Sequence, residues 1–206
     1  MKELTPLPSV QRYIPLNYEN FIDKYIVQYC KVFYPFFKKL NFTPNTLTTF
    51  SLVLGLLTCY TFYKKKYKLS AILLFSSYIF DVLDGDYARK YKMVTKFGDY
   101  YDHIKDLIVY SCFAIIFIIF NRYSKKNLII IIIISCLFLL SILFNLICKM
   151  KYIEKGNKEH RSHTFKYLAD LIPIINCDKI MSYLRYFDAA AFVLVITIIV
   201  FMHPKN

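Results

Sequence analysis

The acidic residues of this 206-residue chain are concentrated in one short segment. Only 14 residues are Asp or Glu, yet six aspartates fall between positions 81 and 106: Asp81, Asp84, Asp86, Asp99, Asp102 and Asp106. Long apolar stretches flank this segment on both sides. A charged side chain within a bilayer costs about 2.5–3.5 kcal/mol, so carboxylates placed here are expected to serve a ligand. Residues 81–106 are therefore the candidate site.

The spacing of these residues places them on two helix faces. One stripe, at positions i, i+3, i+4 and i+7, consists of Asp81, Asp84, Gly85 and Ala88. A second stripe, with residues four apart, consists of Gly98, Asp102 and Asp106. The small residues leave room for a ligand or a neighbouring backbone. Antiparallel helices would bring the carboxylates face to face, and Asp oxygens without His or Cys favour Mg²⁺ or Mn²⁺.

Other interpretations of the charged residues remain open. The aligned aspartates could form a buried salt-bridge network with Arg89, Lys92 and Lys105, the last of which lies inside a predicted membrane span. Asp86 and Asp99 lie on neither stripe, so each is expected to be solvated or to support the aligned aspartates.

The histidines offer weaker candidates for chemistry. His103 follows Asp102 and is expected to be a supporting or surface group rather than a catalytic one. His160 and His163 suggest a metal site, but no third ligand is evident. A basic loop facing lipid headgroups is the preferred interpretation of that segment.

The composition indicates the elements that must position these residues. Hydrophobic residues make up 57% of the chain, charged residues 20%, and the mean hydropathy is +0.39. These values exclude an ordinary soluble enzyme and a disordered chain. The net charge of +13 fits anionic lipid headgroups and phosphate substrates better than nucleic acid. The six cysteines show no metal-binding spacing and are expected to be small core residues.

The expected fold is an all-α integral membrane protein with a bundle of six transmembrane helices. The predicted spans are 45–63, 69–88, 100–121, 127–148, 164–178 and 184–203. With the N-terminus in the cytoplasm, 17 of the 27 Lys and Arg residues lie on the cytoplasmic side. This orientation makes the protein multi-pass with its site on the cytoplasmic side, in a membrane that the sequence does not specify.

Residues 21–40 predict an amphipathic helix in the membrane interface. Apolar residues recur at helical spacing, while Lys24, Lys31 and Lys38 lie seven apart on another face. Pro35 is expected to kink this helix or to split it. Packing on a partner helix is the alternative. The chain thus divides into an N-terminal segment, 1–44, and a six-span catalytic domain, 45–206.

The acidic segment carries a family resemblance. Residues 81–106 follow the pattern D-x2-D-G-x2-A-R-x8-G-x3-D-x3-D without departure, which resembles the signature of the CDP-alcohol phosphotransferase family. Upstream, Pro44, Asn45 and Thr48 resemble the family's Pro-Asn-x-x-Thr segment at the start of the first membrane helix.

The resemblance implies a reaction in which a hydroxyl attacks the β-phosphorus of a CDP-linked donor and CMP leaves. It implies that Mg²⁺ or Mn²⁺ is held by the motif carboxylates Asp81, Asp84, Asp102 and Asp106. It also implies that Asp106 is the general base, a role that suits a position one helical turn beyond a metal ligand. Nucleotide-binding residues implied in the same way are Gly85, Ala88, Arg89, Gly98, Asn45 and Thr48.

Two substrate arrangements remain open within this family. CDP-diacylglycerol would donate a phosphatidyl group to a small alcohol such as inositol, serine or glycerol 3-phosphate, and the short chain favours this arrangement. Alternatively, CDP-choline or CDP-ethanolamine would donate to diacylglycerol, which the Asp102–His103 pair favours. A cation or proton transporter is the alternative of another class, but neither inverted repeats nor broken spans are evident. Dimerisation is common in families of this appearance, so a second copy of the chain, in a homodimer, is a candidate partner.

Overall fold

The computed structural model describes residues 18–120, 125–155 and 177–202, and every regular element in these ranges is helical. The helices are α1 (Phe21–Cys30), η1 (Lys31–Phe33), α2 (Tyr34–Lys39), α3 (Pro44–Tyr63), α4 (Tyr67–Lys90), α5 (Lys96–Phe120), α6 (Lys125–Lys155), α8 (Cys177–Leu184) and α9 (Ala189–Met202). The predicted all-α fold is confirmed for these ranges. Most of the predicted span 164–178, together with His160 and His163, lies outside them.

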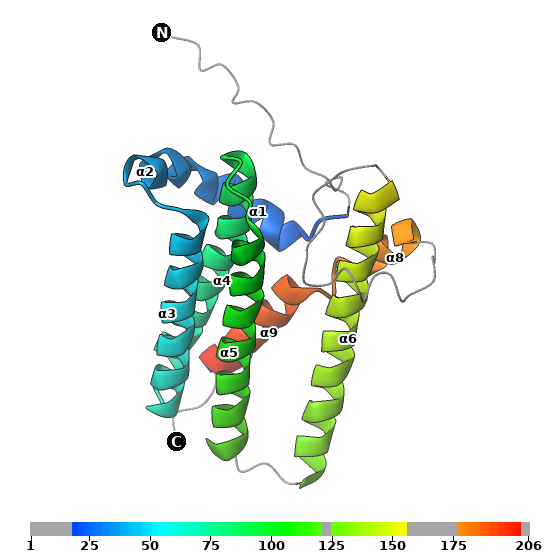
Figure 1. Cartoon of the computed structure of the whole chain (residues 1–206). Coiled ribbons are helices and arrows are strands. Elements are labelled where there is room, and N and C mark those ends of the chain that lie inside the picture. Colours follow the sequence, from blue (N-terminus) through cyan, green and yellow to red (C-terminus); the bar gives the residue numbers. More distant parts are fainter. Residues whose placement is uncertain (1–17, 121–124, 156–176, 203–206) are drawn as a thin grey trace.

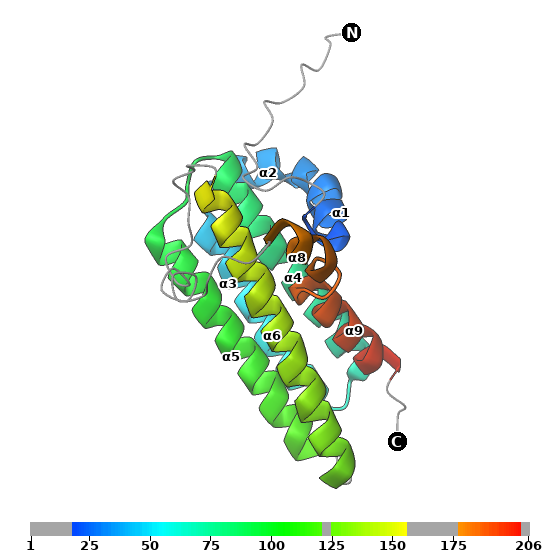
Figure 2. The same ribbon diagram turned by 90° about the vertical axis from the view of Figure 1, so that its right-hand side faces the viewer.

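Helices α3, α4 and α5 form the bundle that carries the acidic segment. Helix α3 packs against both α4 and α5, and α9 packs against the other side of α4. Helix α6 runs beside this bundle and contacts α8 near one end (Figure 1). Both views place α1 and α2 across the same end of the bundle (Figures 1 and 2). The acidic segment lies toward this end, where α4 finishes and α5 begins.

Local sequence explains where the bundle helices begin and turn. Thr43 and Thr46 form a reciprocal capping box at the start of α3, and Pro44 occupies its first turn, where no N–H is required. After α3 and α4 the chain reverses at Lys65 and Lys92, each with φ of 57°. This left-handed conformation ends each helix and returns the chain antiparallel.

Small and hydroxylated residues allow the three bundle helices to approach closely. The hydroxyls of Ser51 on α3 and Ser77 on α4 each donate to the other's backbone carbonyl, at 2.9 and 2.8 Å. At Gly55 on α3, an added Cβ would lie 2.7 Å from both methyl carbons of Val109 on α5. Such contacts are typical of helices packed within membranes, where small residues bring backbones together.

Three described stretches are long and apolar enough to cross a membrane: Pro44–Tyr63, Ser135–Tyr152 and Lys179–Met202. The third includes most of α8 and all of α9, with a turn between them. Helices α4 and α5 have 24 and 25 residues and therefore the length of a span, but they also carry the acidic residues.

The predicted helix 21–40 is divided into two α-helices. The break falls at η1, and Pro35 lies in the first turn of α2, where its missing N–H leaves no bond unmade. The predicted split is therefore confirmed. The hydroxyl of Tyr78 on α4 donates to Asp23 on α1, and the hydroxyl of Tyr34 on α2 donates to Asp86 on α4 at 3.0 Å. These two bonds fix α1 and α2 against α4.

The six cysteines are free thiols, but the prediction that all of them are core residues is wrong: Cys136 is exposed, and Cys30 and Cys112 are half-buried, because they lie on helix faces that other helices do not fully cover. Cys59, Cys148 and Cys177 are buried within apolar clusters and act there as small packing residues. The fold of the described residues therefore depends on helix packing and not on disulfide bonds.

Candidate active site

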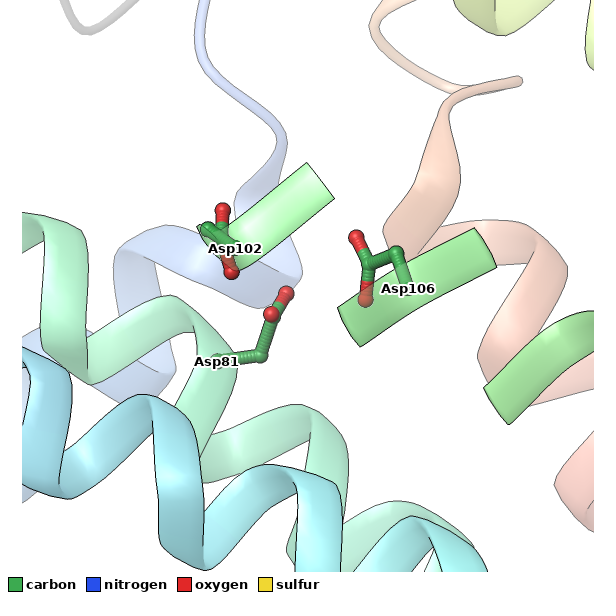
Figure 3. Close-up of side chains that lie close together, drawn as sticks. All are labelled: Asp81, Asp102 and Asp106. Atoms are coloured by element: carbon green, nitrogen blue, oxygen red, sulfur yellow. The ribbon is translucent and has the colours of Figure 1, made fainter. Parts of the chain in front are cut away.

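Three carboxylates from two helices converge at one point. Asp81 lies on α4, whereas Asp102 and Asp106 lie one helical turn apart on α5 (Figure 3). One carboxylate oxygen of each residue lies within 4.8 Å of the others. The antiparallel arrangement of α4 and α5 thus brings together three of the four aspartates that the spacing singled out.

The side chain of Lys105 lies among these carboxylates. Its ammonium nitrogen forms an ion pair with Asp81 and lies 2.8 Å from Oδ1 of Asp106 and 3.2 Å from Oδ1 of Asp102. It also donates to Oγ of Ser51 on α3 at 3.4 Å. Lys105 is only 2% exposed, so one buried ammonium links carboxylates from both helices.

Asp84 lies outside the group of close oxygens formed by the other three aspartates. It is 5% exposed, and its Oδ2 accepts a hydrogen bond of 2.5 Å from the hydroxyl of Thr48 on α3. The same hydroxyl lies 3.1 Å from the Pro44 carbonyl. The upstream segment is therefore joined to the acidic segment through Asp84.

The donor set fits a hard divalent cation. All three converging groups are oxygens, the ligand type that Mg²⁺ and Mn²⁺ prefer. Oδ1 of Asp102 is buried and, among the described residues, accepts no hydrogen bond of acceptable geometry, although Lys105 is near. Three carboxylates against one ammonium leave an excess of negative charge, which a cation would neutralise.

The predicted nucleotide-binding residues lie around the ends of the same helices. An added Cβ at Gly98 would lie 3.1 Å from Oδ1 of Asn45 and 3.1 Å from Oγ1 of Thr95, so Asn45 approaches the start of α5. At Gly85, an added Cβ would lie 3.3 Å from the Arg89 guanidinium. Ala88 is partly exposed, one turn beyond Asp84.

The remaining charged residues of the segment pair with neighbours. Arg89 lies 3.9 Å from Asp86 on the same helix. His103 lies 3.7 Å from Asp99 on α5. Asp86 is buried and therefore not solvated, and the supporting roles of Asp86 and Asp99 stay predictions.

A small pocket adjoins the carboxylates between α3, α4 and α5. Its polar lining comes from Ser51, Ser77, Tyr78 and Tyr110, together with Asp81, Lys105 and Asp106. Four residues with hydroxyl groups therefore line the space next to Lys105, and Ser51 is the one whose hydroxyl oxygen contacts the ammonium in the described residues.

The sequence of residues 41–203 matches the CDP-alcohol phosphatidyltransferase family. The chain belongs to this family. The match includes every residue of the acidic segment and most of the described helices. Membership in a family of membrane enzymes, together with the three apolar stretches, identifies the chain as an integral membrane protein.

One curated relative is the archaetidylinositol phosphate synthase of Pyrococcus horikoshii. The two sequences are 39% identical over 67 residues, which cover 32% of this chain. The chain spans about a third of that relative, since the matched region covers 36% of its length. No solved structure matches the chain.

Two features of the site were not predicted from the sequence. The sequence predicts Lys105 only as one partner of a salt-bridge network, whereas the structure places it among three carboxylates. One signal in the sequence could have indicated this position: Lys105 directly precedes Asp106 within a largely apolar helix. The bond between Thr48 and Asp84 joins residues 36 positions apart, and no local pattern indicates it.

Proposed function

We propose that this protein is a CDP-alcohol phosphotransferase of phospholipid synthesis. It would transfer a phosphatidyl group from CDP-diacylglycerol to a small polar alcohol and release CMP. The observation that carries the proposal is the convergence of Asp81, Asp102 and Asp106 from two helices, in a chain of this family. An enzyme acting on a lipid-linked pyrophosphate needs such an oxygen-rich site at the membrane.

The carboxylates of Asp81, Asp84, Asp102 and Asp106 are proposed to hold Mg²⁺ or Mn²⁺. Asp84 is included because it lies one helical turn from Asp81 and is buried. When bound, such a cation would neutralise the pyrophosphate oxygens of the donor. The hydroxyl of Thr48 orients the Asp84 carboxylate through its hydrogen bond.

Asp106 is proposed as the general base of the reaction. Its carboxylate takes the proton of the acceptor hydroxyl as the hydroxyl oxygen forms a bond to the β-phosphorus. The bond from this phosphorus to the CMP oxygen breaks, and CMP leaves with the electron pair. The Asp106 side chain is 35% exposed, which leaves it accessible to a substrate hydroxyl.

The nucleotide is proposed to bind beside these carboxylates. Gly85, Ala88 and Gly98 provide the space that a bulky donor requires, because their side chains are absent or minimal. The half-exposed guanidinium of Arg89 is available for phosphate oxygens. Asn45 and Thr48 place the polar start of α3 next to this region.

The chain is proposed to cross the membrane six times, with the site on the cytoplasmic side and α1 and α2 in the interface. Helices α4 and α5 would span about 36 Å each at 1.5 Å per residue, enough to cross the hydrocarbon core. Exposed aromatic residues on α1, η1 and α2 support the interfacial position: Phe21, Tyr25, Tyr29, Phe33 and Phe36. The division into segments 1–44 and 45–206 and the homodimer also stay predictions.

The acceptor alcohol is identified by assaying a panel of candidate substrates. An inositol-containing acceptor is tested first, because the curated relative is named an archaetidylinositol phosphate synthase. Serine and glycerol 3-phosphate follow. CDP-choline and CDP-ethanolamine with diacylglycerol complete the panel, because His103 follows Asp102 as in variants that use these donors.

The test is CMP release from CDP-diacylglycerol by the purified chain in detergent with Mg²⁺ or Mn²⁺. We expect activity that disappears with a chelator, returns with metal, and falls by at least roughly a hundredfold in Asp106→Asn. Asp99→Asn is the matched control, since it removes a carboxylate from the same helix outside the converging group. No CMP release from any CDP-alcohol, with every acceptor of the panel, would reject the proposal.

A further inference from the structure

We propose that Lys105 is a built-in competitor of the divalent cation, occupying the carboxylates in the metal-free protein and withdrawing when the cation binds. This inference rests on the proposed function, because it concerns the same carboxylates. It adds a property of this chain, namely that one of its own side chains limits the affinity of the site for metal.

The Lys105 ammonium and a divalent cation need the same oxygens. The Lys105 ammonium contacts Asp81 and lies within 3.2 Å of one oxygen each of Asp102 and Asp106. These are the three residues whose oxygens lie within 4.8 Å of one another. Two cations sharing these oxygens would repel strongly, because little solvent separates them.

The ammonium of Lys105 is also buried. Lys105 is 2% exposed, so neither water nor salt screens its charge effectively. An unpaired lysine at this depth would be costly, and the three carboxylates would repel one another without a cation. Lys105 therefore stabilises the metal-free site and joins α4 to α5 through Asp81.

The Lys105 ammonium has other oxygen acceptors nearby. Oγ of Ser51, which belongs to α3 and not to either carboxylate helix, already lies 3.4 Å from its nitrogen. The adjoining pocket is lined by four residues that carry hydroxyl oxygens, Ser51, Ser77, Tyr78 and Tyr110, of which Tyr78 donates its own hydrogen to Asp23. The flexible four-carbon stem of lysine can move the ammonium to these oxygens while keeping it hydrogen-bonded.

The experiment is a Mn²⁺ titration of the full-length chain in detergent, with free Mn²⁺ followed by electron paramagnetic resonance and no nucleotide present. Lys105→Met and Lys105→Gln remove the competing charge, and we expect each to lower the Kd for Mn²⁺ by roughly tenfold or more. Lys96→Met is the control, because it removes one positive charge from an exposed position at the start of the same helix. Its Kd is expected to equal that of the wild type.

A second readout is thermal unfolding. In a chelator, Lys105→Met is expected to unfold at a lower temperature than the wild type, because its carboxylates lack a counterion. Added Mn²⁺ is expected to raise the unfolding temperature of the variant by more than it raises that of the wild type. If Lys105→Met does not fold, Lys105→Gln carries the test, since its amide still donates hydrogen bonds to the carboxylates.

An unchanged or weaker affinity for Mn²⁺ in the folded variants would overturn the role of Lys105, as would the absence of Mn²⁺ binding in wild type and variants alike. Binding by the variants with none by the wild type would support it. The proposed function fails separately, by the absence of CMP release from the wild type. A wild type that releases CMP while the variants bind no tighter rejects only the role of Lys105.

Discussion

The hydroxyl of Thr48 on α3 donates a 2.5 Å hydrogen bond to the Asp84 carboxylate on α4. Both side chains are buried, with exposed fractions of 2% and 5%. The bond joins the start of α3 to the acidic segment across the interface of two closely packed helices. The polar start of α3 is thus part of the same structural unit as the acidic segment.

Thr48→Val tests this bond. The substitution preserves the shape of the side chain but leaves a buried carboxylate without its donor, so the free energy of unfolding should fall by about 1–3 kcal/mol. CMP release should fall as well, because Asp84 loses its fixed orientation. Thermal unfolding and the CMP assay check both effects.

Thr58→Val is the matched control for Thr48→Val. Thr58 is also buried on α3, but its hydroxyl donates to the Leu54 carbonyl of the same helix at 3.0 Å. We expect a smaller loss of stability and unchanged CMP release. Equal effects of the two substitutions on CMP release would mean that the bond to Asp84 has no particular role.

Gly55→Ala tests the close approach of α3 and α5. An added Cβ would lie 2.7 Å from both methyl carbons of Val109, so the helices must shift, at a cost of about 1–3 kcal/mol. Adding Val109→Ala removes the clash. Thermal unfolding is measured for the wild type, both single variants and the double variant. The double variant should lose less stability than the sum of the two single losses. Simple additivity would contradict the contact.

Asp81→Asn tests the proposed metal ligand on α4. An amide keeps the size of the side chain but removes one negative charge from the converging group, so the Mn²⁺ concentration for half-maximal CMP release should rise roughly tenfold or more. Asp99→Asn provides the control and should leave this concentration unchanged. A Mn²⁺ requirement that is the same in Asp81→Asn and the wild type would argue against the ligand role.

Asp23 gives a pH dependence of stability. Burial raises the pKa of its carboxyl from 3.8 to about 6, while the hydrogen bond from Tyr78 opposes part of this rise. The folded protein therefore binds this proton more tightly than the unfolded chain does. The resulting stabilisation is complete below about pH 4 and disappears as the pH rises through about 6.

Asp23→Asn removes this titration. The stability of the wild type relative to the variant should decline between pH 4 and 7 by up to about 3 kcal/mol. Thermal unfolding of both proteins at several pH values measures the decline. A difference between the two proteins that is constant with pH would show that Asp23 titrates normally.

Much of the fold could be predicted from the sequence. The start of α3 follows from Thr43 and Pro44, which cap the helix locally, and the apolar content dictates helices that satisfy their own backbone. The split of the helix 21–40 was predicted from Pro35, but its place at η1 was not. Helix boundaries depend on packing against α4 as well as on local sequence.

The candidate site, too, could be predicted only in part from the sequence. The spacing of Asp102 and Asp106 placed both on one helix face, and the turn after α4 brought Asp81 opposite them, as antiparallel helices require. The sequence did not separate Asp84 from that group. Thr48 on α3 donates a hydrogen bond to Asp84, and this pairing depends on how α3 and α4 pack.

The sequence by itself determined the membrane class, the helical elements and the carboxylates that share a face, because hydropathy and helical periodicity are local properties of the chain. Only the tertiary structure decided which side chain neutralises those carboxylates. Lys105 lies on the same helix as Asp102 and Asp106, yet its ammonium also contacts Asp81 on α4 and Ser51 on α3. Such a position depends on the distances between three helices, and the order of residues does not encode these distances in any local pattern.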